Sequence, residues 1–181
     1  RLALHDRKAW VEQAPIPSAH GANVVVRLES TPICGSDKKH FLNPDKTIRY
    51  AGHEGTGVVV EVDKSNLVKV GDRVLTNCLS GCGVCEHCRS GNYVYCENKL
   101  PMDQMASHFC QYTILQDFLC IPLPEDISYD MGTLAGCVLA PAFQTLQKMQ
   151  VIPSDLVMVL GCGPVGLGAI TIAKHYGAQV L

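Results

Sequence analysis

Four cysteines at positions 82, 85, 88 and 96 constrain this chain more than any other feature of its sequence. They lie in the stretch GCGVCEHCRSGNYVYC and follow the pattern C-x2-C-x2-C-x7-C. Two-residue spacers let a tight turn direct successive thiolates at one point, and a tetrahedral zinc takes four such ligands. The pattern therefore predicts a zinc site at Cys82, Cys85, Cys88 and Cys96; reduced loop cysteines or two disulfides are the alternatives.

The spacing of the same cysteines argues against an iron–sulfur cluster. A ferredoxin-type run places its fourth cysteine after three residues and follows it with proline. Here the last spacer has seven residues and Glu97 follows Cys96. Because all four zinc positions would be filled by protein, the predicted site is structural rather than catalytic. His87, inside the same segment, is expected to be an exposed loop residue.

Composition limits the classes of protein to which the chain can belong. Hydrophobic residues make up 47% of its 181 residues and charged residues 18%, which predicts a soluble globular chain with a sizeable core. No apolar run approaches the roughly 20 residues of a membrane span. The net charge of −2 and the absence of a basic block make nucleic acid an unexpected partner. In particular, a nucleic-acid-binding zinc ribbon would need basic and aromatic residues around the cysteines, and the acidic Glu86 and Glu97 stand there instead.

Two further observations bear on the cellular compartment of the protein. The first residues, RLALHDRKAWVEQAPIP, lack the apolar h-region and the cleavage site of a secretory signal. Clustered cysteines in a reducing compartment more often bind metals than form disulfides. Both observations predict a cytoplasmic protein. Four further cysteines have no motif around them and are interpreted as packing residues: Cys78, Cys110, Cys120 and Cys162.

The pattern of the chain changes near residue 128. Before it, short β-rich runs alternate with turn residues and predict a β-barrel or sandwich; these runs are 23–30, 55–63, 71–77, 109–116 and 118–124. After it come a helical stretch at 129–150, an apolar strand at 156–160, a glycine turn, a helix at 165–177 and the start of another strand at 178–181. This order predicts an α/β chain that ends within an opening βαβ unit.

The glycine turn contains Gly161, Gly163 and Gly166 in G-x-G-x-x-G order. A strand precedes it and a helix follows it, which is the context that dinucleotide binding requires. The helix amino terminus would then face the phosphates. A tight strand-to-helix turn without a ligand is the alternative.

Two further short motifs stand out in the sequence, CGSD at 34–37 and GHEGTG at 52–57. Each is weak alone, but in this order with the cysteine segment and the glycine turn they resemble the zinc-containing medium-chain alcohol and polyol dehydrogenases over the whole chain. The resemblance implies a GroES-like β-barrel catalytic domain at 1–138 and the beginning of an NAD(P)-binding Rossmann domain at 139–181. The chain would then be truncated, and the full-length enzyme would form a homodimer or homotetramer.

The resemblance also implies a second, catalytic zinc held by Cys34, His53 and Cys137. Three protein ligands leave one coordination position for water or the substrate oxygen. Glu54 resembles the acidic residue that stands behind the zinc in this family. Asp37 resembles the aspartate that holds the ligating histidine and fixes its tautomer.

The remaining assignments concern proton transfer and the cofactor. Ser36 resembles the hydroxyl that accepts the alcohol proton. The family often continues the relay with a histidine at the position that Lys39 occupies here. His40, one place later, or water would then carry the proton outward, and Lys39 is an alternative contact for cofactor phosphate. The cofactor, NAD or NADP, would lie against the turn formed by Gly161, Gly163, Pro164, Val165 and Gly166.

The implied reaction is oxidation of an alcohol to an aldehyde or ketone with hydride transfer to NAD(P)+. A polyol, an amino alcohol or an aminocyclitol is the alternative substrate within the same superfamily. A non-catalytic, zinc-stabilised fragment or interaction module is the alternative outside it.

Overall fold

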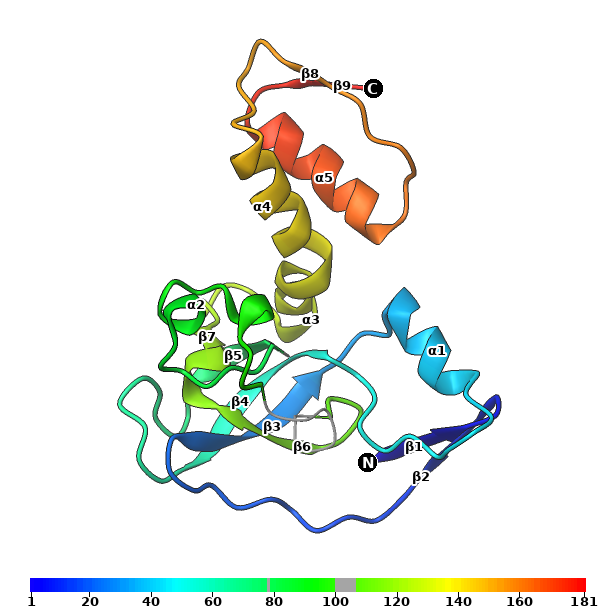
Figure 1. Ribbon diagram of the computed structural model, residues 1–181, viewed down its shortest axis with the longest axis vertical. Coiled ribbons are helices and arrows are strands. Elements are labelled where there is room, and N and C mark those ends of the chain that lie inside the picture. Colours follow the sequence, from blue (N-terminus) through cyan, green and yellow to red (C-terminus); the bar gives the residue numbers. More distant parts are fainter. Residues whose placement is uncertain (78, 100–106) are drawn as a thin grey trace. The chain divides into compact units, whose positions relative to one another are not determined.

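The computed structural model describes residues 1–77, 79–99 and 107–181 (Figure 1). The chain forms two compact units, Arg1–Thr133 and Leu134–Leu181. None of the helices in the described ranges combines the length and the hydrophobicity that crossing a membrane requires. Cys78 lies outside the described residues.

A five-stranded antiparallel sheet forms the centre of the first unit. Its strand order is β6-β3-β4-β5-β7 (Figure 1). The five predicted strands are confirmed, with the bounds β3 Asn23–Ser30, β4 Glu54–Val62, β5 Arg73–Asn77, β6 Tyr112–Gln116 and β7 Cys120–Pro122.

The core of this unit follows from the alternation of side chains along the strands. Val24 pairs with Leu115 of β6 on one side and with Val62 of β4 on the other. Residues two apart point to the same face of a strand, so Val26 joins Val24 in the core. Val59 and Val74 of the next two strands complete a cluster in which these β-branched side chains are fully buried.

A β-hairpin at the amino end was not predicted. It consists of β1 Leu2–His5 and β2 Lys8–Val11, joined by Asp6 and Arg7. Both turn residues have left-handed backbones, with φ of 40° and 63°, without the glycine or asparagine that normally signals such a turn. Their N–H groups donate to the carbonyls of Asn43 and Phe41, and these bonds stabilise the turn.

Short helical turns connect the strands. They are the 3-10 helices η1 Gly35–Asp37, η2 Tyr93–Tyr95 and η4 Asp117–Leu119 and the helices α1 Lys38–Phe41, α2 Glu86–Arg89 and α3 Tyr129–Thr133. The Thr56 hydroxyl on β4 donates to the carbonyl of Tyr129 at 2.8 Å, and this bond fixes α3 to the sheet.

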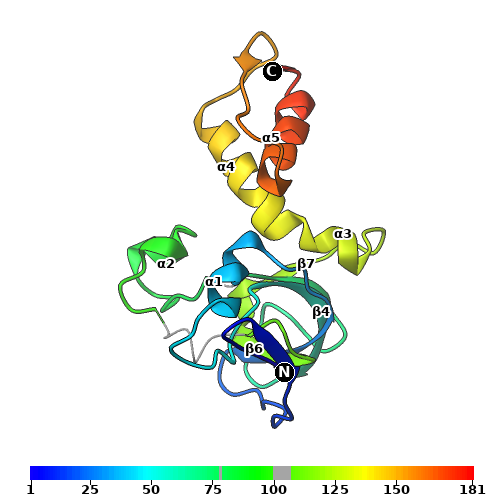
Figure 2. The same cartoon turned by 90° about the vertical axis from the view of Figure 1, so that its right-hand side faces the viewer.

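The second unit is a small βαβ unit preceded by a helix. Its elements are the π-helix η5 Ala135–Leu139, α4 Ala140–Lys148, β8 Leu156–Val157, α5 Pro164–His175 and β9 Gln179–Val180. Strands β8 and β9 pair in parallel, and α4 and α5 lie side by side (Figure 2).

Two predicted elements of this region differ from the structure. The helical stretch 129–150 is divided into α3, η5 and α4, and Pro141 at the first turn of α4 marks a new helix start. The strand predicted at 156–160 extends only over Leu156–Val157, because β9 pairs with those two residues alone.

Candidate metal centres and nucleotide-binding turn

The first candidate centre is the four-cysteine segment. Ligand atoms of Cys82, Cys85, Cys88 and Cys96 all lie within 4.8 Å of one another. The sulfurs of Cys82 and Cys88 are 3.9 Å apart, far beyond a disulfide bond and close to the edge of about 3.8 Å in a tetrahedron of thiolates around zinc. The four thiols therefore fit a tetrahedral metal, and their arrangement does not fit the predicted alternative of disulfides.

Backbone N–H groups point at the sulfurs of this segment. The amides of Cys82, Cys85 and Cys88 donate to sulfurs at 3.3–3.4 Å. Donors of this kind stabilise a thiolate. The N–H groups of Val84 and Cys85 accordingly lower the pKa of the Cys82 thiol to about 6, whereas burial raises the pKa of Cys88 to about 12.

Gln116 anchors the segment to the sheet, a role that the sequence did not reveal. Its amide accepts a hydrogen bond from Gly81 N–H at 3.2 Å and donates one to Gly81 C=O at 2.7 Å. At position 81 a Cβ atom would lie 2.7 Å from the Cys88 sulfur, so only glycine fits beside the thiols. His87 is exposed, and its ring contacts Tyr95 with centroids 5.8 Å apart.

The second candidate centre lies at the start of β4. The Cys34 sulfur, a His53 ring nitrogen and a Glu54 carboxylate oxygen lie within 4.8 Å of one another. Glu54 opens β4 and is buried, and its oxygen is 3.5 Å from His53 Nε2. The structure thus brings the sulfur of Cys34 to the adjacent residues His53 and Glu54, 19 and 20 positions later in the chain. This set combines a soft sulfur with a nitrogen and an oxygen, which suits zinc.

Asp37 orients two of these residues at once. Its Oδ1 lies 3.3 Å from His53 Nδ1, and its Oδ2 accepts the backbone N–H of Cys34 at 2.9 Å. Asp37 is buried, so few waters compete for its carboxylate. A hydrogen bond from Nδ1 leaves Nε2 of His53 available on the side of Glu54.

Two residues assigned to proton transfer follow Cys34 in the chain. Ser36 lies on η1 and is exposed. His40 lies on α1, half-buried, with its ring edge-on to Tyr50 at a centroid distance of 6.1 Å. Burial, followed by the charge of Lys39, lowers the pKa of His40, so its ring is held neutral to a lower pH than usual.

Cys137 and the glycine turn belong to the second unit. Cys137 lies on η5, a π-helical turn of the kind that often marks functional sites, and is half-buried. Gly161 has φ of +100° and Gly163 precedes α5, which starts at Pro164. A Cβ at Gly166 would lie 2.0 Å from the Gly161 carbonyl, so the turn requires glycine there. Val165, in the first turn of α5, is exposed.

The isolated cysteines divide into two kinds. Cys120 is buried in the core, and Cys110 is half-buried with its thiol donating to the carbonyls of Ser107 and Tyr112, so packing is confirmed for both. The same prediction is wrong for Cys162, which is exposed because it lies in the turn between β8 and α5, where nothing lies within 4 Å of a Cβ at Gly161 or Gly163.

Comparison with known proteins identifies the first unit. Residues 20–125 match the family model described as the alcohol dehydrogenase GroES-like domain. An uncharacterised zinc-type alcohol dehydrogenase-like protein of Escherichia coli is 32% identical, covering 93% of this chain and 52% of that protein. A probable D-xylulose reductase A of Aspergillus clavatus is 35% identical, covering 93% of this chain and 49% of that protein.

A solved structure supports the same relationship along the whole chain. The alcohol dehydrogenase TADH from Thermus sp. ATN1 matches with a TM-score of 0.89 and 28% identity, covering 99% of this chain and 56% of that one. The chain therefore spans about half the length of these relatives. The predicted α/β fold class and family resemblance are confirmed: the chain belongs to the family of alcohol dehydrogenases with a GroES-like domain.

Proposed function

We propose that the complete polypeptide is a zinc-dependent dehydrogenase that oxidises an alcohol to an aldehyde or ketone with hydride transfer to NAD(P)+. One observation carries the proposal: His53 lies between the Asp37 and Glu54 carboxylates, within 4.8 Å of the Cys34 sulfur. A sulfur and an oriented imidazole are zinc ligands, and this pair lies at the start of the central strand β4. The zinc-type alcohol dehydrogenase-like relative agrees with this assignment.

Cys34, His53 and Cys137 are the proposed ligands of the catalytic zinc. Cys137 follows Thr133 by four residues, and four residues of chain span at most about 14 Å. Since Tyr129 at the start of α3 is bonded to Thr56 of β4, the chain leaves the first unit near the strand that carries Glu54. This anchoring supports Cys137 as the third ligand. Glu54 would stand beside the metal as a carboxylate available during ligand exchange.

The protein's own residues would position the substrate and move its proton. A bound zinc would supply Lewis-acid polarisation of the substrate oxygen, and NAD(P)+ would accept the hydride. Ser36, two residues after Cys34, would accept the hydroxyl proton of the substrate. Asp37 would keep the imidazole of His53 in place during the reaction. His40, four residues after Ser36, is the proposed next acceptor, because a neutral imidazole can take a proton. The lowered pKa of its ring would favour passing that proton on to solvent.

A second, structural zinc is proposed at Cys82, Cys85, Cys88 and Cys96. The sulfur separation and the N–H donors described above support this assignment. Because all four ligands are supplied by one short segment, this metal would stabilise the segment rather than bind substrate.

The glycine turn is the proposed site for the pyrophosphate of NAD or NADP. The backbone at Gly161 and Gly163 leaves open space where a side chain would otherwise stand, and α5 follows directly. The exposed amino end of a helix favours phosphate groups. Pro164, Val165 and Gly166 form the first turn of that helix.

The substrate class has a second candidate. The relative named as a probable D-xylulose reductase favours a polyol over a simple alcohol. An amino alcohol or an aminocyclitol is the further alternative. A non-catalytic zinc-stabilised module is disfavoured by the second set of donors around His53, which such a module would not need.

The test is a dehydrogenase assay on the complete polypeptide. We expect reduction of NAD+ or NADP+ with a panel of alcohols and polyols, and loss of at least about a hundredfold in kcat/KM for His53→Ala. His20→Ala, which alters an exposed histidine elsewhere in the first unit, is the matched control. Turnover by His53→Ala at the rate of the control would refute the assignment. Light scattering on the same preparation tests the proposed homodimer or homotetramer.

A further inference from the structure

Residues 107–109 lie along the stretch of chain that carries two of the candidate zinc donors. The N–H of His108 donates to the carbonyl of Gly52 at 3.2 Å, and the N–H of Phe109 donates to the carbonyl of Ala51 at 3.1 Å. These two hydrogen bonds join the segment to the loop that leads into β4.

Glycines allow the two segments to approach closely. Gly52 has a φ of +80°, and a Cβ there would lie 2.6 Å from the ring of Phe109. A Cβ at Gly55 would lie 2.9 Å from the ring of His108. These glycines are the first and fourth residues of the stretch GHEG, and the candidate donors stand between them. Each ring therefore occupies the space beside a residue that is adjacent to a donor.

The ring of His108 adds an oriented hydrogen bond to this contact. Its Nε2 lies 2.7 Å from Oγ1 of Thr76 on β5, and both side chains are buried. The Thr76 hydroxyl donates its one proton to the carbonyl of Gly55 at 2.9 Å, so Nε2 of His108 carries a proton and donates it to the hydroxyl. The series of hydrogen bonds thus ends on the residue that follows Glu54.

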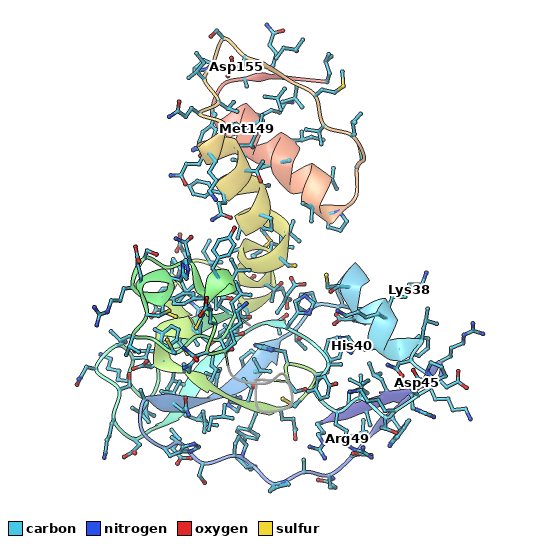
Figure 3. The ribbon with its side chains drawn as sticks, in the orientation of Figure 1. Lys38, His40, Asp45, Arg49, Met149 and Asp155 are labelled. Carbon is cyan, nitrogen blue, oxygen red and sulfur yellow. The ribbon has the colours of Figure 1, made fainter. Side chains whose placement is uncertain are left out.

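The burial of His108 indicates how it can influence the candidate centre. The residue is 0% exposed, whereas His40 of the proposed proton relay lies on the helix α1 (Figure 3). A buried ring cannot contact a substrate, but it can hold the end of a strand in place. Because water does not readily replace a lost partner at a buried group, the bond to Thr76 favours one position of β4 against β5.

We propose that His108 is a positioning residue of the candidate catalytic centre. It contacts Thr76 and Gly55, and these contacts fix the start of β4 and so the directions of the donors, His53 and Glu54. The proposal rests on the proposed function, because it concerns the geometry of the proposed catalytic zinc. Residues that orient metal ligands contribute about 10- to 100-fold to metal affinity, and His108, which acts one step further out, should contribute about tenfold.

The first experiment compares two substitutions of His108. His108→Leu keeps much of the bulk of the ring but loses the donor, whereas His108→Gln keeps an N–H that can reach Thr76. Zinc affinities of the complete polypeptide are measured by chelator competition, at a temperature at which circular dichroism shows both variants folded. We expect His108→Leu to weaken the binding of one of the two zinc ions about tenfold, and His108→Gln to stay within about threefold of the unmodified protein. Equal weakening in both variants, or none in either, would overturn the proposal.

Two further variants identify the affected ion and the route. Cys34→Ser removes a ligand of the candidate catalytic centre, and the affinity for the zinc ion that remains should not respond to His108→Leu. Thr76→Val should weaken the same ion as His108→Leu does, and the double variant should be no weaker than either single variant, because both changes remove one shared bond. Additive losses would contradict positioning through Thr76.

A buried threonine elsewhere in the sheet supplies the matched control. Thr113 on β6 is 3% exposed, as Thr76 is, and Thr113→Val should leave both zinc affinities unchanged. A loss equal to that of Thr76→Val would mean that any change in the core has this effect, and it would overturn the proposal.

The unmodified polypeptide separates this proposal from the proposed function. If it binds only one zinc ion, the proposed function fails and the role of His108 fails with it. If it binds two and His108→Leu weakens neither, only the role of His108 fails.

Discussion

The Nδ1 atom of His53 lies 3.3 Å from Oδ1 of Asp37, and the other oxygen of this buried carboxylate accepts the backbone N–H of Cys34. One carboxylate thus sets both the ring orientation of the histidine and the path of the chain at the cysteine. Cys34 and His53 are 19 positions apart in sequence, so Asp37 connects the start of η1 to the loop before β4. The geometry of the donor set therefore depends on a residue that does not itself belong to the donor set.

Replacing Asp37 should weaken metal binding without removing a ligand. Asp37→Asn keeps an acceptor for Cys34 N–H but loses the negative charge that holds His53 Nδ1–H. Since partners of this kind are worth about 10- to 100-fold in metal affinity, we expect zinc affinity to fall by that factor in a chelator-competition titration. Asp45→Asn, at an exposed acid, should have no effect. Equal affinities in the two variants would rule out an orienting role for Asp37.

Removing one thiol from the four-cysteine segment should affect stability. Cys96 is buried, and Cys96→Ser takes one ligand from the proposed structural zinc. Because metal binding contributes directly to folding, we expect the free energy of unfolding to fall by about 4 kcal/mol. Chemical denaturation checks this change. Cys162→Ser, at an exposed thiol, is the control and should leave the stability within about 0.5 kcal/mol. A Cys96→Ser protein as stable as this control would contradict a structural metal.

Two glycines of the turn should respond differently to alanine. A Cβ at Gly166 would meet the Gly161 carbonyl at 2.0 Å, whereas nothing lies within 4 Å of a Cβ at Gly163. Gly166→Ala should therefore destabilise the protein by about 2 kcal/mol or more, while Gly163→Ala should keep its stability and lose affinity for NAD(P)H. Thermal unfolding and cofactor fluorescence titration measure the two effects. Normal cofactor binding by Gly163→Ala would contradict a nucleotide-binding role for this turn.

The buried thiol of Cys120 should lower the free energy of unfolding as the pH rises above the ordinary pKa of cysteine. Burial, followed by the nearby Asp117 charge, raises the pKa of its thiol from 9.0 to about 12. Between these values the unfolded chain loses the proton and the folded chain keeps it, so the free energy of unfolding falls as pH rises. The slope for one group is at most about 1.4 kcal/mol per pH unit. Cys120→Ala should show a shallower slope above pH 9.0 in urea denaturation. A slope unchanged by the substitution would refute this origin.

The sequence predicted the sheet well because its signals are local. Short β-rich runs bounded by glycine, proline, asparagine or aspartate predict β3, β4 and β5 to within two residues at each end. The hairpin β1–β2 was missed because Asp6 and Arg7 adopt left-handed backbones without a glycine, and bonds to Asn43 and Phe41 stabilise their turn. A contact between distant segments leaves no local pattern in a sequence.

The same distinction holds for the candidate sites. The spacing of the four cysteines is local and is sufficient to predict their convergence, which the structure has. The two hydrogen bonds between Gln116 and Gly81 join residues 35 positions apart and were not predictable. The proximity of His53 to Cys34 followed from family resemblance rather than from spacing. The exposure of Cys162 was mispredicted, because cysteine is usually buried and its two flanking glycines were read only as a turn.

A dehydrogenase with both proposed metal centres should hold two zinc ions in each chain. Elemental analysis of the purified protein should give about two zinc ions per chain, one in the four-cysteine segment and one at the candidate catalytic centre. Cys34→Ser should reduce this value to about one, while the fold measured by circular dichroism remains. A single zinc ion per chain that is unaffected by Cys34→Ser would contradict the proposed catalytic centre.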